Sequence, residues 1–134
     1  MTAEEETTLR LVLPSDGALH EPTLNFFGAC GLSVLRPNSR RYTGTIPALS
    51  GVEVLFQRTA DITEKVEEGS AELGVTGLDR LLEYRHDDHT VAALINNLRY
   101  GQCDFVLAVP NSWLDVTSVA DLAALALEFR QQGK

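Results

Sequence analysis

The chain has 134 residues and 44% hydrophobic residues, enough for one domain with its own core but short for two. Nineteen acidic residues stand against 11 basic ones, and the formal net charge is −8. This overall field repels polyanions and disfavours non-specific nucleic-acid binding.

The N-terminal segment and the cysteines indicate the cellular compartment of the protein. Residues 1–8 form an acidic leader without the basic and apolar regions of an export signal. No later apolar run approaches the roughly 18 residues of a membrane helix. Cys30 and Cys103 are too few for a disulfide framework and have apolar neighbours in sequence. We therefore expect buried thiols in a cytoplasmic protein without a membrane segment.

In chain order, the first half alternates short apolar runs with helical patterns. Residues 9–13 predict a buried strand entering a turn, and residues 21–29 have apolar side chains at helical spacing. Residues 32–35 and 42–46 predict short strands on either side of a polar, basic loop.

The middle of the chain repeats this order. Residues 52–56 predict a strand, and Asp61 is a candidate N-cap for a helix over 62–68. A short apolar strand is expected at 73–76, followed by a helical pattern that ends near Tyr84.

The last third is predicted to hold the sheet's centre and a final helix. Residues 91–99 are strand-like, and 103–109 form the longest apolar run, which predicts a central strand. Thr117 or Ser118 can cap a helix through residue 126. Alternating strands and helices predict an α/β fold with a mostly parallel sheet flanked by helices.

Ligands of such sheets bind at loops that leave the carboxyl ends of strands. Three loops fit: 15–17, 57–61 and 76–79. Amides of Ser15, Asp16 and Gly17 can meet an anion, although a plain turn that Ser15 or Asp16 caps locally is favoured from the sequence alone. In the third loop, Gly77 permits close backbone approach and Asp79 can bind a sugar hydroxyl or cap a helix.

Charge and reactive side chains give further candidates. Arginines at positions 36, 40, 41 and 58 concentrate positive charge on loops, which suits phosphate or a solvated surface. His86 and His89, with the aspartates between them, suggest a metal site superficially, but a polar loop is favoured because no matching ligand pair exists. Cys103 has no assignable histidine partner for covalent catalysis, so a buried thiol is favoured.

Five segments, taken in order, resemble the N-terminal part of the ATP phosphoribosyltransferase family. The most specific is the string Glu-Gly-Ser-Ala-Glu-Leu-Gly-Val-Thr-Gly-Leu-Asp at 68–79. The other matching segments are 9–19, 39–42, 58–62 and 100–110.

The resemblance implies a lobe of the type II periplasmic-binding-protein kind at 9–110, then a crossover helix or the start of a second lobe at 111–134. It implies transfer of a phosphoribosyl group from phosphoribosyl pyrophosphate to an adenine ring nitrogen of ATP, the first step of histidine biosynthesis, with Mg²⁺ on the pyrophosphate substrate. The full-length enzyme is expected to be a homo-oligomer, with its own regulatory domain or a regulatory subunit resembling histidyl-tRNA synthetase.

By the same resemblance, Arg40 and Arg58 are the expected catalytic residues at the phosphate side, and no residue is assigned as a metal ligand. The expected substrate-binding residues are Ser15, Asp16, Gly17, Arg41, Thr76, Gly77, Leu78, Asp79 and Cys103.

Two departures from the family pattern matter. Ser15 and Ala18 stand where many members have basic side chains, with Asp16 between them. The Gly/Thr-rich loop of the second lobe is absent after Pro110, so we expect a truncated chain that is inactive alone. The alternative is a non-enzymatic solute- or effector-binding lobe of the same fold.

Overall fold

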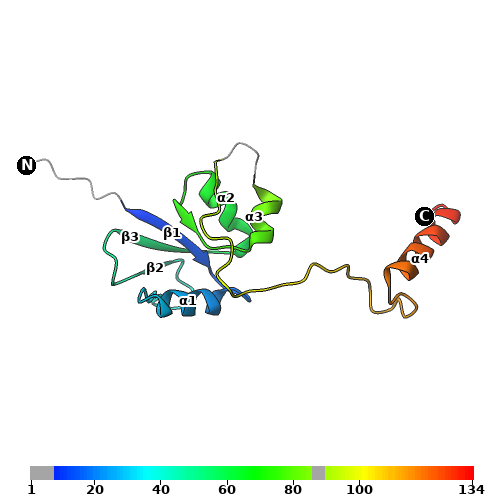
Figure 1. Ribbon diagram of the computed structural model, residues 1–134, viewed down its shortest axis with the longest axis horizontal. Coiled ribbons are helices and arrows are strands. Elements are labelled where there is room, and N and C mark those ends of the chain that lie inside the picture. Colours follow the sequence, from blue (N-terminus) through cyan, green and yellow to red (C-terminus); the bar gives the residue numbers. More distant parts are fainter. Residues whose placement is uncertain (1–7, 86–89) are drawn as a thin grey trace, which may run out of the picture. The chain divides into compact units, whose positions relative to one another are not determined.

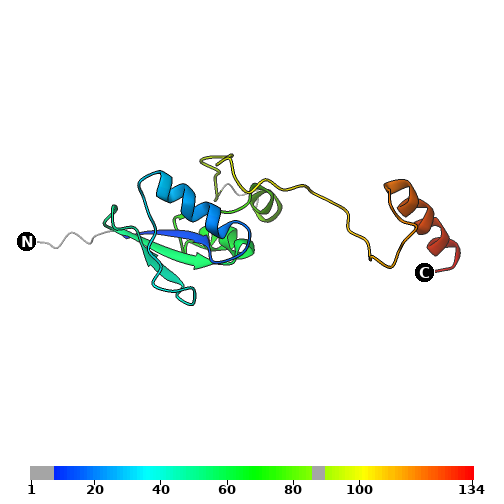
Figure 2. The ribbon, with the colours of Figure 1, turned by 90° about the horizontal axis from the view of Figure 1, so that it is seen from below.

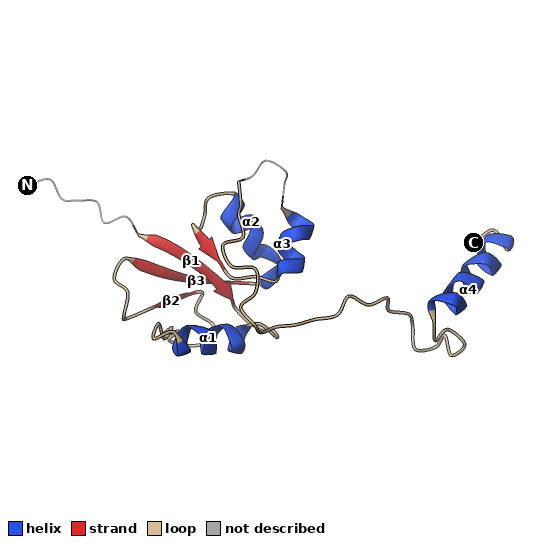
Figure 3. Cartoon of the chain, viewed as in Figure 1, coloured by secondary structure: helices blue, strands red, loops and turns tan. Residues whose placement is uncertain are grey.

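The computed structural model describes residues 8–85 and 90–134, and the chain divides into two compact units, Met1–Gln102 and Cys103–Lys134. The first unit holds a four-stranded sheet with three helices and a 3₁₀ turn (Figures 1 and 3). Its elements are β1 (Leu9–Pro14), α1 (His20–Ala29), β2 (Thr43–Thr45), β3 (Val52–Gln57), η1 (Thr59–Asp61), α2 (Ile62–Glu67), β4 (Leu73–Gly74) and α3 (Leu78–Tyr84).

The strand order is β2-β3-β1-β4. Strand β1 pairs in parallel with β3, from Leu9 opposite Val52 to Pro14 opposite Gln57, and in parallel with β4 on its other side. Strand β2 is antiparallel to β3. The predicted mixed, mostly parallel sheet flanked by helices is confirmed at this level.

Side chains of β1 point alternately into two cores, as the period of a strand requires. Leu11 and Leu13 pack with Phe56 and with apolar side chains of α1 on one face. Val12 packs with Ile62 of α2 on the other face. Helix α1 lies below the sheet in Figure 1, with α2 and α3 above it, and Figure 2 shows the unit from the α1 side.

The second unit contains helix α4 (Val119–Gln131). Ser118 caps it, because its hydroxyl accepts a 3.1 Å hydrogen bond from the amide of Asp121. The ring of Phe129 packs edge to face on Trp113, with centroids 6.1 Å apart. The predicted helix is thus confirmed, with Ser118 as the cap, and it is longer than expected.

Three strand predictions are wrong. Residues 103–109 form no strand, and the side chains of Phe105, Val106 and Leu107 are 70% to 100% exposed. Residues 91–99 are irregular, and 32–35 contribute only a bridge at Leu35. An apolar run becomes a strand only when a neighbour pairs with its backbone, and across residues 8–85 and 90–134 none does so with 103–109.

Both cysteines are free and exposed, so the prediction of buried thiols is wrong. Cys30 is the C-cap residue of α1, and Cys103 is the first residue of the unpaired apolar run. The acidic leader up to residue 7 and the polar loop from His86 to His89 lie outside the described residues. None of the helices described is long and apolar enough to cross a membrane.

Candidate functional site at the carboxyl edge of the sheet

Four candidate segments meet at one edge of the sheet because of its topology. The loops after β1, β3 and β4 leave the carboxyl ends of parallel strands that lie side by side. The loop before β2 reaches the same edge because β2 is antiparallel, and the amide of Phe56 donates to the carbonyl of Tyr42 over 2.7 Å. We call this region the carboxyl edge; it comprises residues 15–17, 38–42, 58 and 76–79.

The first loop is fixed at both ends. The amide of Ser15 donates to the carbonyl of Gln57 over 2.8 Å, and the amide of His20 donates to the carbonyl of Gly17 over 3.2 Å. Gly17 has a φ of +76°, which favours glycine. Leu19 occupies the N-cap of α1 without a side-chain hydrogen bond, so neither Ser15 nor Asp16 caps this helix.

In the loop after β4, the carboxylate of Asp79 lies close to the backbone of Gly77. Gly77 is the N-cap of α3, in extended conformation and without a side-chain cap, so Asp79 does not cap the helix. A Cβ atom on Gly77 would overlap the Asp79 carboxylate. Thr76 is half-buried, whereas Leu78 and Asp79 are exposed. Asp79 is therefore open to a ligand, and its position depends on glycine at 77.

Three arginines of the carboxyl edge are exposed. The loop before β2, residues 36–42, is called the basic loop. Asn38 holds its backbone, since the side-chain oxygen of Asn38 accepts from the amide of Arg40 over 3.0 Å and its carbonyl accepts from the amide of Arg41 over 3.1 Å. The Arg58 side chain is 77% exposed and pairs with Asp61 over 2.9 Å. Asp61 occupies the N-cap position of α2, as the sequence predicted, but its side chain makes this ion pair and no capping hydrogen bond.

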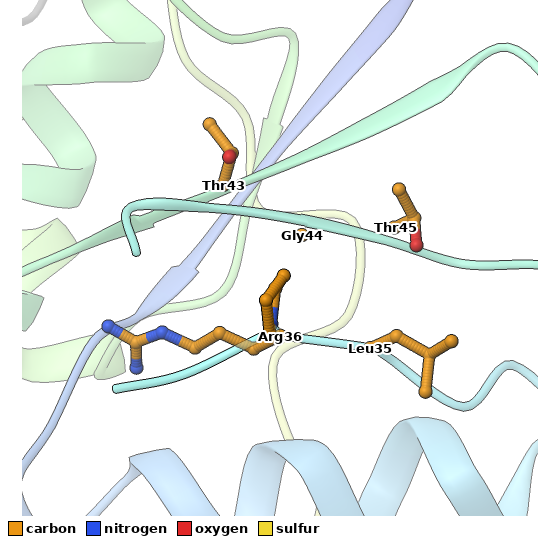
Figure 4. A pocket seen from close by; sticks show the side chains of 6 residues that line it. Leu35, Arg36, Thr43, Gly44 and Thr45 are labelled. Carbon is orange, nitrogen blue, oxygen red and sulfur yellow. The ribbon is translucent and has the colours of Figure 1, made fainter. Parts of the chain in front are cut away.

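Arg36 differs from these three because its guanidinium group binds three backbone carbonyls. It donates to the backbone carbonyls of Ser15, Ser39 and Arg41, each over 2.8 Å. It also lies 4.3 Å from the centroid of the Phe56 ring. Arg36 also lines a pocket between residues 35–37 and 43–45, and Figure 4 shows its side chain extending beside the end of β1.

Sequence reasoning missed two polar side chains around α1. The His20 ring donates from Nδ1 to the carbonyl of Pro14 over 2.7 Å and contacts the Phe56 ring edge-on. Tyr100 shares a 2.8 Å hydrogen bond with Thr23, and burial raises the pKa of its phenol. The signal for His20 was its place just after a candidate loop, and the signal for Tyr100 was its place at the start of the matching segment 100–110.

Cys103 is exposed and belongs to the second unit, whereas the other predicted site residues belong to the first. Over the described ranges, 8–85 and 90–134, no three histidine, cysteine or acidic side chains are grouped so that they could hold a metal ion. The carboxyl edge offers arginines, backbone amides, hydroxyl groups and two exposed aspartates, Asp16 and Asp79, as its chemical groups.

The sheet and its carboxyl edge have the architecture of α/β proteins that bind small ligands beyond the ends of their strands. A model of the ATP phosphoribosyltransferase family matches residues 58–132, and the chain belongs to this family.

Curated relatives carry the same name. ATP phosphoribosyltransferase of Nitrobacter winogradskyi is 40% identical over 127 residues, which are 94% of this chain and 39% of that relative. The protein of the same name from Bradyrhizobium sp. strain ORS 278 is 40% identical over 125 residues, covering 92% of this chain and 38% of the relative. The protein of the same name from Chelativorans sp. is 37% identical over 126 residues, which are 93% of this chain and 55% of that relative. The chain thus spans 38% to 55% of the length of these three proteins.

Proposed function

We propose that the protein carrying this chain transfers the phosphoribosyl group of phosphoribosyl pyrophosphate to an adenine ring nitrogen of ATP, the first step of histidine biosynthesis. The bond between the anomeric carbon and the pyrophosphate oxygen breaks, a bond from that carbon to nitrogen forms, and pyrophosphate leaves with the electron pair. Family membership supports this reaction. One observation supports particular residues for this reaction: Arg40, Arg41 and Arg58 lie at the same edge of the sheet as the Gly77 loop.

The arginines are proposed for the phosphate side of the reaction. Displacement at the anomeric carbon requires alignment of two substrates and stabilisation of the departing negative charge. Arg40 and Arg58 present guanidinium groups on exposed side chains, and such groups bind phosphate oxygens in pairs. They attract phosphate locally within a chain of net charge −8. Mg²⁺ is proposed to arrive as part of the pyrophosphate substrate.

The remaining edge residues are proposed for the nucleotide or ribose. Thr76, Gly77, Leu78 and Asp79 lie on the loop after β4, where an exposed carboxylate can accept hydrogen bonds from ribose hydroxyls. In the first loop, backbone amides rather than side chains are proposed to contact the substrate, because the Asp16 carboxylate would repel a phosphate. Cys103 remains a proposed substrate-binding residue on the family resemblance alone.

The finer fold assignment is also a proposal. We infer a lobe of the type II periplasmic-binding-protein kind over 9–110 and a crossover over 111–134, in a cytoplasmic enzyme whose second lobe completes the site. The limited share of each relative that the chain spans supports a longer catalytic unit. Family membership names an enzyme, and no observation favours a non-enzymatic binding lobe.

Calorimetric titration with ATP and with AMP tests the site. Wild type is expected to bind, and Arg40→Ala and Arg58→Ala are expected to bind about tenfold more weakly or worse. Arg85→Ala is the charge-matched control, because Arg85 follows the far end of α3 and is exposed. Unchanged affinity in both edge variants would overturn the site, and release of pyrophosphate by the full-length protein tests the reaction itself.

A further inference from the structure

We propose that Arg36 is a positioning residue: it locks the first loop to the loop that carries Arg40, and so sets the spacing between two walls of the substrate site. The inference rests on the proposed function, because it concerns the binding of the same phosphorylated substrates.

Three carbonyls converge on one side chain. Nη1 of Arg36 binds the carbonyl of Ser15 in the first loop, while Nε and Nη2 bind those of Arg41 and Ser39 in the basic loop. These loops are separated by helix α1 in the sequence. The planar guanidinium fork is suited to such a three-way contact, which a lysine ammonium on a flexible stem cannot reproduce.

The guanidinium group rests on a fixed platform. The Phe56 ring below it is fully buried, and the backbone of Phe56 is bound to Tyr42 of the basic loop. A cation over an aromatic face adds attraction to the three hydrogen bonds. The basic loop is therefore fixed by two sets of contacts, the backbone bond between Phe56 and Tyr42 and the hydrogen bonds from Arg36.

The backbone of Arg36 is also fixed. Its neighbour Leu35 exchanges two hydrogen bonds of 2.8 and 2.9 Å with Thr45 of β2. Gly44 allows this close approach, because a Cβ atom there would lie 2.7 Å from the carbonyl oxygen of Leu35. Figure 4 shows the two segments side by side, with Arg36 extending from them.

The three hydrogen bonds from Arg36 to the two loops, which we call the clamp, determine which backbone groups of the loops are available to a phosphate. The carbonyl and amide of one trans peptide point in opposite directions. Because the carbonyls of Ser15 and Arg41 turn toward Arg36, the amides of Asp16 and Tyr42 turn away from it. The carbonyl oxygens, which would repel an anion, thus point toward Arg36, whereas the amide donors point away from it. Arg36 acts through these loops rather than by touching the substrate.

The test compares Arg36→Met and Arg36→Lys with Arg10→Met in the purified protein. Arg10 is a matched control, since its guanidinium group also makes several contacts, to Glu72 and to the carbonyl of Gly69, but at the start of β1, away from the carboxyl edge. The two readouts are amide hydrogen exchange at Ser15 and Arg41 and the affinity for ATP and AMP. Melting temperature is recorded to match the variants for stability.

Arg36→Met is expected to speed exchange at both amides and to weaken nucleotide binding about tenfold or more. Arg36→Lys should recover only part of either property, and Arg10→Met should lower the melting temperature while leaving both unchanged. Unchanged exchange in both Arg36 variants would overturn the clamp, and faster exchange with wild-type affinity would overturn its role in positioning. If Arg36→Met fails to fold, Arg36→Lys decides by the same criteria.

A wild-type protein that binds neither nucleotide would overturn the proposed function and with it the positioning role, whereas exchange at Ser15 and Arg41 would still decide the clamp.

Discussion

The Thr76 hydroxyl donates a hydrogen bond of 3.1 Å to the backbone carbonyl of Thr59. Thr76 follows β4 and Thr59 follows β3, and β1 lies between these two strands in the sheet. The bond therefore passes beyond the end of β1 and joins two loops whose strands do not pair. Together with the Arg36 contacts and the hydrogen bond from the amide of Ser15 to the carbonyl of Gln57, it links all four segments of the carboxyl edge.

Thr76→Val should lower the free energy of unfolding by about 1 kcal/mol, because it removes this hydrogen bond from a half-buried site at nearly constant volume. Urea denaturation measures the change. The same variant should weaken ATP binding, since the Gly77 loop loses its tie to the Arg58 loop. Stability and affinity both equal to wild type would show that the bond does not organise the edge.

Thr63→Val is the same chemical change with the opposite expected sign. The Thr63 hydroxyl is buried in α2 and has no hydrogen-bond partner among the described residues. Replacing an unsatisfied buried hydroxyl with a methyl group should raise the free energy of unfolding by about 1 kcal/mol. Urea denaturation beside Thr76→Val gives the comparison, and a loss of stability here would mean that the hydroxyl is satisfied.

Glu72 should make stability pH-dependent in the acid range. Hydrogen bonds from the side chain and backbone of Arg10 lower the pKa of this carboxyl from 4.5 to about 2. A carboxyl whose pKa is lower in the folded state contributes stability above about pH 4.5, and loses it as the pH falls toward 2. Glu72→Gln should therefore flatten the fall in stability between these values.

Thermal unfolding at several pH values measures this effect, and Glu64→Gln, on the exposed side of α2, is the control. The difference between Glu72→Gln and wild type should shrink at high salt, because the pair is exposed to solvent. Parallel pH profiles of wild type and Glu72→Gln at low salt would contradict the assignment.

Gly44→Ala should destabilise the first unit by about 1 to 3 kcal/mol. The added methyl group would meet the carbonyl of Leu35 at 2.7 Å and the Phe56 ring at 3.0 Å, and both of these groups are held in place. Gly28→Ala is the control, because a Cβ atom there has ordinary contact at 3.8 Å and lies within a helix that favours alanine. Equal stability of the two variants would show that Leu35 can shift freely.

Local patterns were sufficient for the strands that have a pairing partner and for the helix that has its own cap. Strands β1 and β3 follow from apolar runs, and α4 follows from the Ser118 cap and its alanine-rich turns. The same reasoning failed for 103–109, because a buried strand requires a pairing partner that a local pattern does not specify. Apolar character predicted burial for Phe105, which is fully exposed.

The candidate site was predictable as far as topology determines it. Loops after parallel strands share an edge by geometry, and the glycine and arginine residues on them are visible in sequence. The role of Arg36 was not predictable, because a side chain that binds three backbone carbonyls leaves no motif. Sequence alone grouped Arg36 with Arg40 as positive charge for a phosphate or a solvated surface, and only the hydrogen bonds to Ser15 and to the basic loop separate them.

Amide hydrogen exchange with and without ATP tests most directly whether the carboxyl edge binds the nucleotide. We predict protection on binding at residues 15–17, 40–42, 58 and 76–79, with no change in the turns around Gly51 and Gly69 at the opposite edge of the sheet. Protection confined to the Gly51 and Gly69 turns, or binding without protection at the carboxyl edge, would contradict the account.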